Sequence, residues 1–133
     1  MNSPVFLDTG YILAAINTAD KFHERAQTAA LHVKPPFVTT EAVLIEIGNA
    51  LSKHRWRALG VATLARFQNA SDIEIVPFER PLLAEAIRLY SARADKEWGL
   101  TDCISFVVMQ TRGLTQVLTT DQHFEQAGFQ NLM

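Results

Sequence analysis

The chain has 133 residues, of which 48% are hydrophobic and 20% are charged, values typical of an ordinary soluble globular protein. The length suits one domain with its own hydrophobic core, and we predict a single domain over residues 1–133. The formal net charge is −2. This charge argues against a protein that holds nucleic acid through overall positive charge, so a nucleic-acid partner would require a local basic patch or a bound metal ion.

The sequence also bears on the compartment. No apolar run reaches the roughly 18 residues that a membrane-spanning helix needs, so we expect no membrane partner. The first residues lack the basic and long apolar segments of a signal peptide. Cys103 is the only cysteine, which excludes an internal disulfide. Together these features predict a cytoplasmic protein.

Hydrophobic periodicity and turn residues predict alternating strands and helices. Pro35 and Pro36 exclude a continuing helix and favour extended backbone, Gly60 is expected to break a helix, and Thr40 and Thr101 are expected N-caps. In chain order we predict a strand over 5–7 that ends at Asp8, helices over 11–16 and from 20 to about 33, a strand over 37–39, helices over 41–54 and 61–69, a strand over 73–78, helices over 81–96 and 101–112, a strand over 116–119, a short helix over 122–126 and a terminal segment over 129–132.

Short strands separated by helices imply crossover connections and a mostly parallel sheet. Because such connections are nearly always right-handed, the predicted fold is α/β, a three-layer α/β/α sandwich with a short sheet. In open parallel sheets the binding crevice lies beyond the carboxyl ends of the strands. Asp8 and Asp121 both follow predicted strands, so we expect both at this edge.

Four carboxylates are candidate site residues, and three have ordinary structural alternatives. Asp8 and Asp121 are each compatible with a turn or a helix N-cap, and Asp102 with the positive end of a helix dipole. Glu46 is harder to explain structurally, because it lies between Ile45 and Ile47 in a helix otherwise rich in apolar residues. Its neighbours on the same helical face include Ala42 and Ala50, whose small side chains leave room around the carboxylate.

Carboxylates gathered in one crevice repel each other, and a divalent cation is the simplest way to offset that charge. Mg²⁺ or Mn²⁺ suits an all-oxygen site. A zinc site is less expected, because the histidines show no close-spaced ligand pattern: His23, His32, His54 and His123. Such a cation would activate a water for phosphodiester hydrolysis, so no covalent nucleophile is needed. Cys103 is therefore interpreted as a core residue and not as a catalytic nucleophile.

The chain resembles PIN-domain ribonucleases, specifically the VapC-like toxins of bacterial toxin–antitoxin pairs. The resemblance lies in four blocks, 5–14, 39–48, 98–106 and 118–129, which contain Asp8, Glu46, Asp102 and Asp121 in the family's order. It implies that these acids bind Mg²⁺ or Mn²⁺ and cut RNA, and that the protein is a homodimer with a small antitoxin partner. It also implies supporting roles for Thr9 and, less directly, Thr120.

Two positions depart from the family pattern. Gly10 stands where many relatives carry Ser or Thr, which leaves Thr9 as the hydroxyl beside the first acid. Gln122 stands where a basic residue is frequent, which weakens the case for a phosphate contact there. Neither departure removes an acid.

One local basic stretch contains an aromatic residue: Lys53, Arg55, Trp56 and Arg57. It is a candidate RNA-binding segment in which the cations contact phosphates and Trp56 stacks on a base. The alternative is that these cations follow a helix C-terminus and complement its dipole.

Three functions remain open from the sequence. The leading one is a divalent-metal-dependent endoribonuclease, the toxin of a toxin–antitoxin pair. A haloacid-dehalogenase-like phosphatase also opens with a strand ending in Asp, but it needs a second Asp where this chain has Gly10. The third is a non-catalytic PIN-like module that binds RNA or protein.

Overall fold

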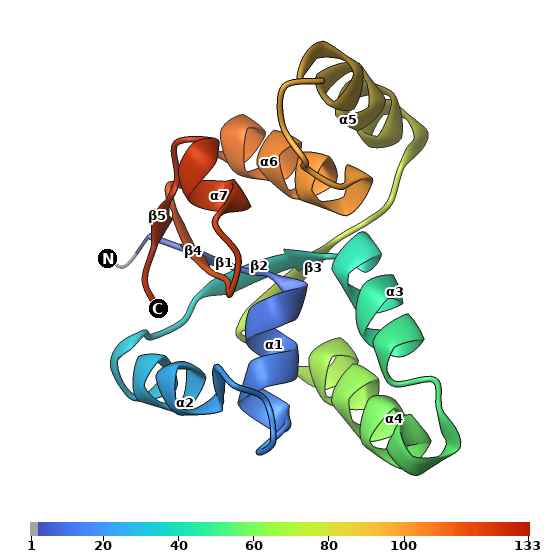
Figure 1. The fold of residues 1–133 in the computed structure, drawn as a ribbon, viewed down its shortest axis with the longest axis vertical. Helices are drawn as coiled ribbons and strands as arrows, with labels where there is room; N and C mark the ends of the chain where they lie inside the picture. Colours follow the sequence, from blue (N-terminus) through green and yellow to red (C-terminus); the bar gives the residue numbers. More distant parts are fainter. Residues whose placement is uncertain (1–2) are drawn as a thin grey trace.

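The computed structural model describes residues 3–133. Its five strands form one sheet in the order β3-β2-β1-β4-β5 (Figure 1). The elements in chain order are β1 Val5–Leu7, α1 Thr9–Ile16, α2 His23–His32, β2 Phe37–Thr40, α3 Glu41–Ala50, α4 His54–Asn69, β3 Ile73–Val76, α5 Arg80–Ala92, α6 Leu100–Arg112, β4 Gln116–Leu118, α7 His123–Gln126 and β5 Gln130–Asn131.

All four pairings between neighbouring strands are parallel, which confirms the predicted α/β class. The chain starts in the middle of the sheet and builds β2 and β3 on one side of β1, then β4 and β5 on the other. Because right-handed crossovers in opposite directions place their helices on opposite faces, α5, α6 and α7 cover one face and α1, α2 and α4 the other (Figure 1).

The strand order reverses between β1 and β4, which makes this pair the switch point of the sheet. Leu7 of β1 pairs with Leu118 of β4, so the two strands end level with each other. Adjacent connections leave this pair toward opposite faces, and the separation opens a crevice at the carboxyl ends. The residues just after these strands are therefore placed side by side by the topology.

Aromatic packing in the core holds α6 and α7 in a fixed position on their face of the sheet. Phe106 of α6 packs edge-to-face on Trp98 and on Phe124 of α7, with ring centroids 5.0 and 4.9 Å apart. Each such pair contributes on the order of 1 kcal/mol beyond the area it buries. Phe124 also contacts Phe6 of β1. This cluster fixes the start of α6 and the loop before α7, where Asp102 and Asp121 lie.

The predicted break at Gly60 is wrong, because Gly60 is buried inside α4. A Cβ at this position would lie 3.1 Å from Cβ of Leu51, so glycine is present to let α4 approach α3 closely. Helix α3 ends at Ala50 rather than near His54. The Ser52 hydroxyl donates to the Gly48 carbonyl over 2.8 Å, which closes the turn early.

Other helix boundaries also differ from the prediction: α1 begins at Thr9, α4 begins at His54, and α5 ends at Ala92 instead of near residue 96. Thr101 is inside α6, whose N-cap residue is Gly99, so the predicted N-cap is wrong by two residues. Asp20 precedes α2 by a turn and accepts the backbone N–H of Phe22 at 2.8 Å, so the helix starts at His23. The Thr40 N-cap is confirmed, since its hydroxyl accepts the N–H of Val43 at 3.1 Å. Within residues 3–133, no helix has the length and apolarity needed to cross a membrane.

Candidate active site

Asp8 follows β1 directly and is only 4% exposed. Its backbone N–H donates to the Leu118 carbonyl over 3.1 Å, which continues the β1–β4 pairing by one residue. Asp8 occupies the N-cap position of α1, yet its side chain makes no capping hydrogen bond. The carboxylate instead accepts the hydroxyl of Thr119, which follows β4, with an Oγ1 to Oδ2 distance of 2.7 Å. The capping explanation for Asp8 therefore fails.

Burial raises the pKa of Asp8 to about 7. Loss of hydration is the largest cause, and the negative charges of Asp121 and Asp102 raise the pKa further. The hydrogen bond from Thr119 acts in the opposite direction, because it stabilises the ionised carboxylate. A buried acid beside two others is the arrangement that a bound cation would stabilise.

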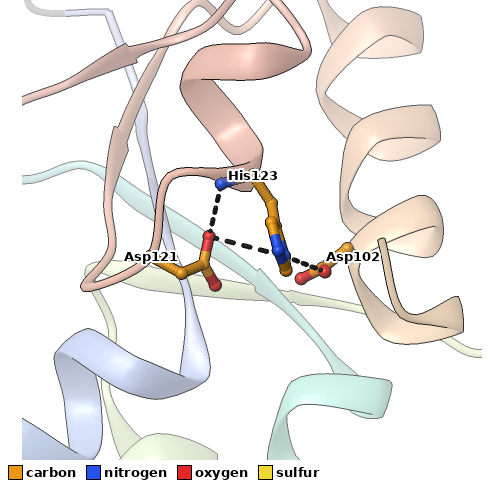
Figure 2. Close-up of side chains that lie close together, drawn as sticks. All are labelled: Asp102, Asp121 and His123. Atoms are coloured by element: carbon orange, nitrogen blue, oxygen red, sulfur yellow. Dashed lines mark hydrogen bonds and ion pairs between the residues drawn. The ribbon is translucent and has the colours of Figure 1, made fainter. Parts of the chain in front are cut away.

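A second part of the site joins the start of α6 to the loop before α7 (Figure 2). Nδ1 of His123 lies 2.8 Å from Oδ2 of Asp102 and 3.8 Å from Oδ1 of Asp121. The backbone N–H of His123 also donates to Oδ1 of Asp121 over 2.8 Å. One ligand atom from each of these three residues lies within 4.8 Å of the others, which is close enough for one metal ion.

Asp102 is held at the N-terminus of α6. Its Oδ2 accepts the backbone N–H of Gly99 at 3.0 Å, so the helix-end interaction expected from its position is present. Burial raises its pKa, the hydrogen bonds from Gly99 and His123 lower it, and the charge of Asp121 raises it again. The structural and the functional interpretations of Asp102 are thus compatible.

Glu46 of α3 is linked to the carboxyl end of β1 by a hydrogen bond from Thr9. The Thr9 hydroxyl donates to Oε1 of Glu46 over 2.6 Å and thereby orients the carboxylate beside the residue that follows Asp8. Glu46 is half-buried, as its position on the small-residue face of α3 requires. The structure therefore brings Asp102, Asp121 and His123 together and places Asp8 within reach of the charges of Asp102 and Asp121. Glu46 is connected to this group only through the hydrogen bond from Thr9, the residue after Asp8.

Gly10 and Thr120 fit each other closely. A Cβ on Gly10 would lie 2.1 Å from Oγ1 of Thr120, so the Thr120 hydroxyl fills the space that a side chain at position 10 would need. The departure from the family pattern at Gly10 is thus matched by Thr120 from the loop after β4. A hydroxyl is present at this point of the site even though residue 10 has none.

Gly10→Ala is expected to lower the free energy of unfolding by about 1–3 kcal/mol, because the new methyl group overlaps the Thr120 hydroxyl. The same substitution made in Thr120→Ala should be much less destabilising, because the hydroxyl is gone. Urea unfolding of the four proteins in a double-mutant cycle measures the coupling. Additive effects of the two substitutions would contradict this close fit.

His123 was not identified from the sequence, although the Asp-x-His spacing of residues 121 and 123 was visible after a predicted strand. Its contact with Asp102, which is 21 residues away in the chain, depends on how α6 packs beside α7. The candidate site therefore contains Asp8, Asp102, Asp121 and His123, with Glu46 joined to it through Thr9. The carboxylate oxygens of this set are ligands that Mg²⁺ and Mn²⁺ prefer, and the imidazole nitrogen is a ligand that transition-metal ions accept more readily than Mg²⁺ does.

The basic segment 53–57 lies at the turn from α3 into α4, at the end of α3 away from Glu41 (Figure 1). Nε and Nη2 of Arg57 donate to the Ser52 carbonyl over 3.1 and 2.7 Å, which is the helix-end role given above as the alternative. Trp56 is half-buried against the core, with the Arg55 guanidinium 5.2 Å from its ring. Lys53 and Arg55 are exposed.

Comparison with known proteins finds one matching family and a similar nuclease. The PIN domain family model matches residues 5–130. The 23S rRNA-specific endonuclease VapC20 of Mycobacterium tuberculosis is 27% identical over 126 residues, which cover 94% of this chain and 95% of that protein.

Solved structures give the same fold. The crystal structure of Mycobacterium tuberculosis VapC20, described as a sarcin-ricin loop cleaving toxin, has a TM-score of 0.88 at 24% identity and covers 94% of this chain and 95% of its own. FitAcB from Neisseria gonorrhoeae has a TM-score of 0.69 at 18% identity over 96% and 95% of the two chains. VapBC2 from Rickettsia felis, bound to a promoter DNA fragment, has a TM-score of 0.66 at 17% identity over 97% and 96%.

Proposed function

The chain belongs to the PIN-domain family, and from this membership we propose that it is a divalent-metal-dependent endoribonuclease that hydrolyses RNA phosphodiester bonds. The observation that carries the proposal is the meeting of Asp8, Asp102 and Asp121 at the switch point of the sheet. They come from three separate segments, and the desolvation of Asp8 has no evident structural benefit. Buried like charges of this kind destabilise a fold, so their presence favours a functional role.

Asp8, Asp102, Asp121 and Glu46 would hold Mg²⁺ or Mn²⁺. When bound, the cation would lower the pKa of a coordinated water and stabilise the leaving oxygen of the phosphodiester. Thr119 keeps the Asp8 carboxylate in place through its 2.7 Å hydrogen bond, and Thr9 does the same for Glu46 at 2.6 Å. These hydroxyls orient the ligands before substrate arrives. Thr120 supports the loop from its contact with Gly10.

RNA is the proposed substrate because the VapC20 relative is a 23S rRNA-specific endonuclease. Lys53 and Arg55 are proposed phosphate contacts because both are exposed. Trp56 is a weaker candidate because it is half-buried against the core, and Arg57 is weaker because its guanidinium already donates to the Ser52 carbonyl. The net charge of −2 makes such local contacts and the cation necessary for holding a polyanion.

We further propose that the protein is a toxin with a small antitoxin partner, and that it forms a homodimer. The likeness to VapC20, whose crystal structure is described as that of a toxin, supports the toxin role, and the antitoxin partner is proposed from that role. Exposed large apolar side chains on α5 and at the start of α6, namely Ile87, Tyr90 and Leu100, support a further protein interface. Light scattering of the purified chain tests the dimer, and co-purification with the product of the neighbouring gene tests the antitoxin.

Removal and restoration of the metal tests the proposed activity. The protein is treated with EDTA and incubated with a structured RNA, and Mg²⁺ or Mn²⁺ is then added back. We expect cleavage only after the addition. Cleavage that persists in EDTA would contradict metal dependence. Hydrolysis of small phosphate esters without RNA cleavage would favour a phosphatase, and metal-independent binding without turnover would favour a non-catalytic module.

A further inference from the structure

The imidazole ring of His123 points into the group of carboxylates at the candidate metal site. Its Nδ1 faces Asp102 and Asp121 rather than solvent, and its side chain is only 26% exposed (Figure 2). Two contacts hold His123 in place. Its backbone N–H donates to the Asp121 carboxylate, and Nδ1 of its ring lies within hydrogen-bond distance of Asp102. An imidazole nitrogen is therefore held in place among the carboxylates.

The distances are those of ligand atoms around one ion. Oxygen and nitrogen ligands of Mg²⁺ or Mn²⁺ lie at about 2.1 Å from the ion, so two neighbouring ligands in an octahedron are about 3.0 Å apart and two opposite ones about 4.2 Å. Nδ1 of His123 is 2.8 Å from Oδ2 of Asp102, which matches neighbouring ligands. Its 3.8 Å separation from Oδ1 of Asp121 lies between the two values. One ion can therefore contact all three atoms after small side-chain movements.

We propose that Nδ1 of His123 is a ligand of the catalytic metal, and that this nitrogen makes the site select Mn²⁺ over Mg²⁺. The inference rests on the proposed function, because it assumes that the acids bind a divalent cation. Mg²⁺ takes oxygen ligands almost exclusively. Mn²⁺ also prefers oxygen ligands, but as a first-row transition-metal ion it accepts an imidazole nitrogen with a smaller loss of affinity than Mg²⁺. Replacing one oxygen by an imidazole nitrogen therefore weakens Mg²⁺ binding relative to Mn²⁺ binding.

The alternative role for His123 is to position Asp102 through a hydrogen bond. That role needs a proton on Nδ1, whereas metal binding needs the Nδ1 lone pair and a proton on Nε2. The two roles therefore differ in whether the ¹⁴N nucleus is bonded to the metal, which can be measured directly.

The test uses the full chain loaded with Mn²⁺ and electron spin echo envelope modulation, which detects ¹⁴N bonded to Mn²⁺. We expect ¹⁴N modulation in the wild type, a shift of its frequencies in protein labelled with ¹⁵N-histidine, and its loss in His123→Gln. His54→Gln is the matched control, because His54 is exposed at the start of α4, and it should keep the modulation. Titration calorimetry should show Mn²⁺ affinity falling about tenfold or more in His123→Gln, with a smaller change for Mg²⁺.

The outcomes separate this inference from the proposed function. Tightly bound Mn²⁺ without ¹⁴N modulation, or modulation that survives in His123→Gln, would overturn the role of His123 and leave the ribonuclease proposal intact. Absence of any bound Mn²⁺ in the wild type would overturn both.

Discussion

Replacing Asp8 with Asn is expected to raise the free energy of unfolding of the metal-free protein by about 4 kcal/mol at pH 8. The substitution keeps the shape of the side chain, and the Asn oxygen can still accept the Thr119 hydroxyl. It removes a negative charge that is buried beside Asp102 and Asp121. The same substitution should abolish metal-dependent RNA cleavage, so stability and activity are expected to change in opposite directions.

The pH dependence follows from the direction of the shift. The pKa of Asp8 is raised from 3.8 to about 7 in the folded protein, so between these values the folded state binds more protons than the unfolded state. The wild type should therefore lose stability as the pH rises from about 4 to about 7, and should change little through Asp8 above that range. Asp8→Asn should lack this part of the loss, because the amide does not titrate.

Urea unfolding in EDTA at intervals from about pH 4.5 to about pH 8.5 measures the effect. The difference between wild type and variant isolates Asp8 from other titrating groups such as Asp102. Asp72→Asn is the control, because Asp72 is exposed on the loop before β3 and the substitution makes the same change in net charge. Parallel stability curves for wild type and Asp8→Asn would show that Asp8 is not buried as a destabilising charge.

Replacing Asp102 with Asn is expected to lower the rate of RNA cleavage at least about a thousandfold, since several kcal/mol of metal-supplied stabilisation would be lost. The fold should be kept, because the Asn oxygen can still accept the Gly99 N–H. The change in unfolding free energy without metal should stay within about 1 kcal/mol. Initial rates on a labelled RNA in Mn²⁺ give the measurement, with circular dichroism to check the fold.

Glu97→Gln is the matched control for Asp102→Asn. It removes one negative charge from the exposed segment that precedes α6, without touching the acids at the strand ends. We expect its cleavage rate to stay near that of the wild type. Equal losses in the two variants would mean that general charge, rather than the position of Asp102, controls the reaction.

The strand-end acids could be predicted because their positions depend on local pattern and general topology. Short apolar runs before Asp8 and before Asp121 indicated strands, and the parallel arrangement then placed both ends at one edge. Glu46 could be predicted as a site residue as well, because a charged residue on a helix rich in apolar residues has no simple structural role. Its hydrogen bond from Thr9, 37 residues away, was not visible in the sequence.

The errors share a cause in long-range packing. Gly60 carries the same local signal whether it ends a helix or lets two helices approach, and only the position of Leu51 decides between them. Thr101 is as good an N-cap residue as Gly99 by type, but the docking of Trp98 on Phe106 sets where α6 begins. His123 becomes part of the site only because α6 brings Asp102 to it.

The chemistry of the cleaved ends tests the central claim most directly. A defined RNA is cut by the Mn²⁺-loaded wild type, and the end groups of both products are determined by mass spectrometry. Attack by a metal-activated water predicts a linear phosphate on one product and a free hydroxyl on the other, with neither product formed by Asp102→Asn. A 2′,3′-cyclic phosphate, or the same products from Asp102→Asn at the wild-type rate, would contradict a metal-dependent carboxylate site.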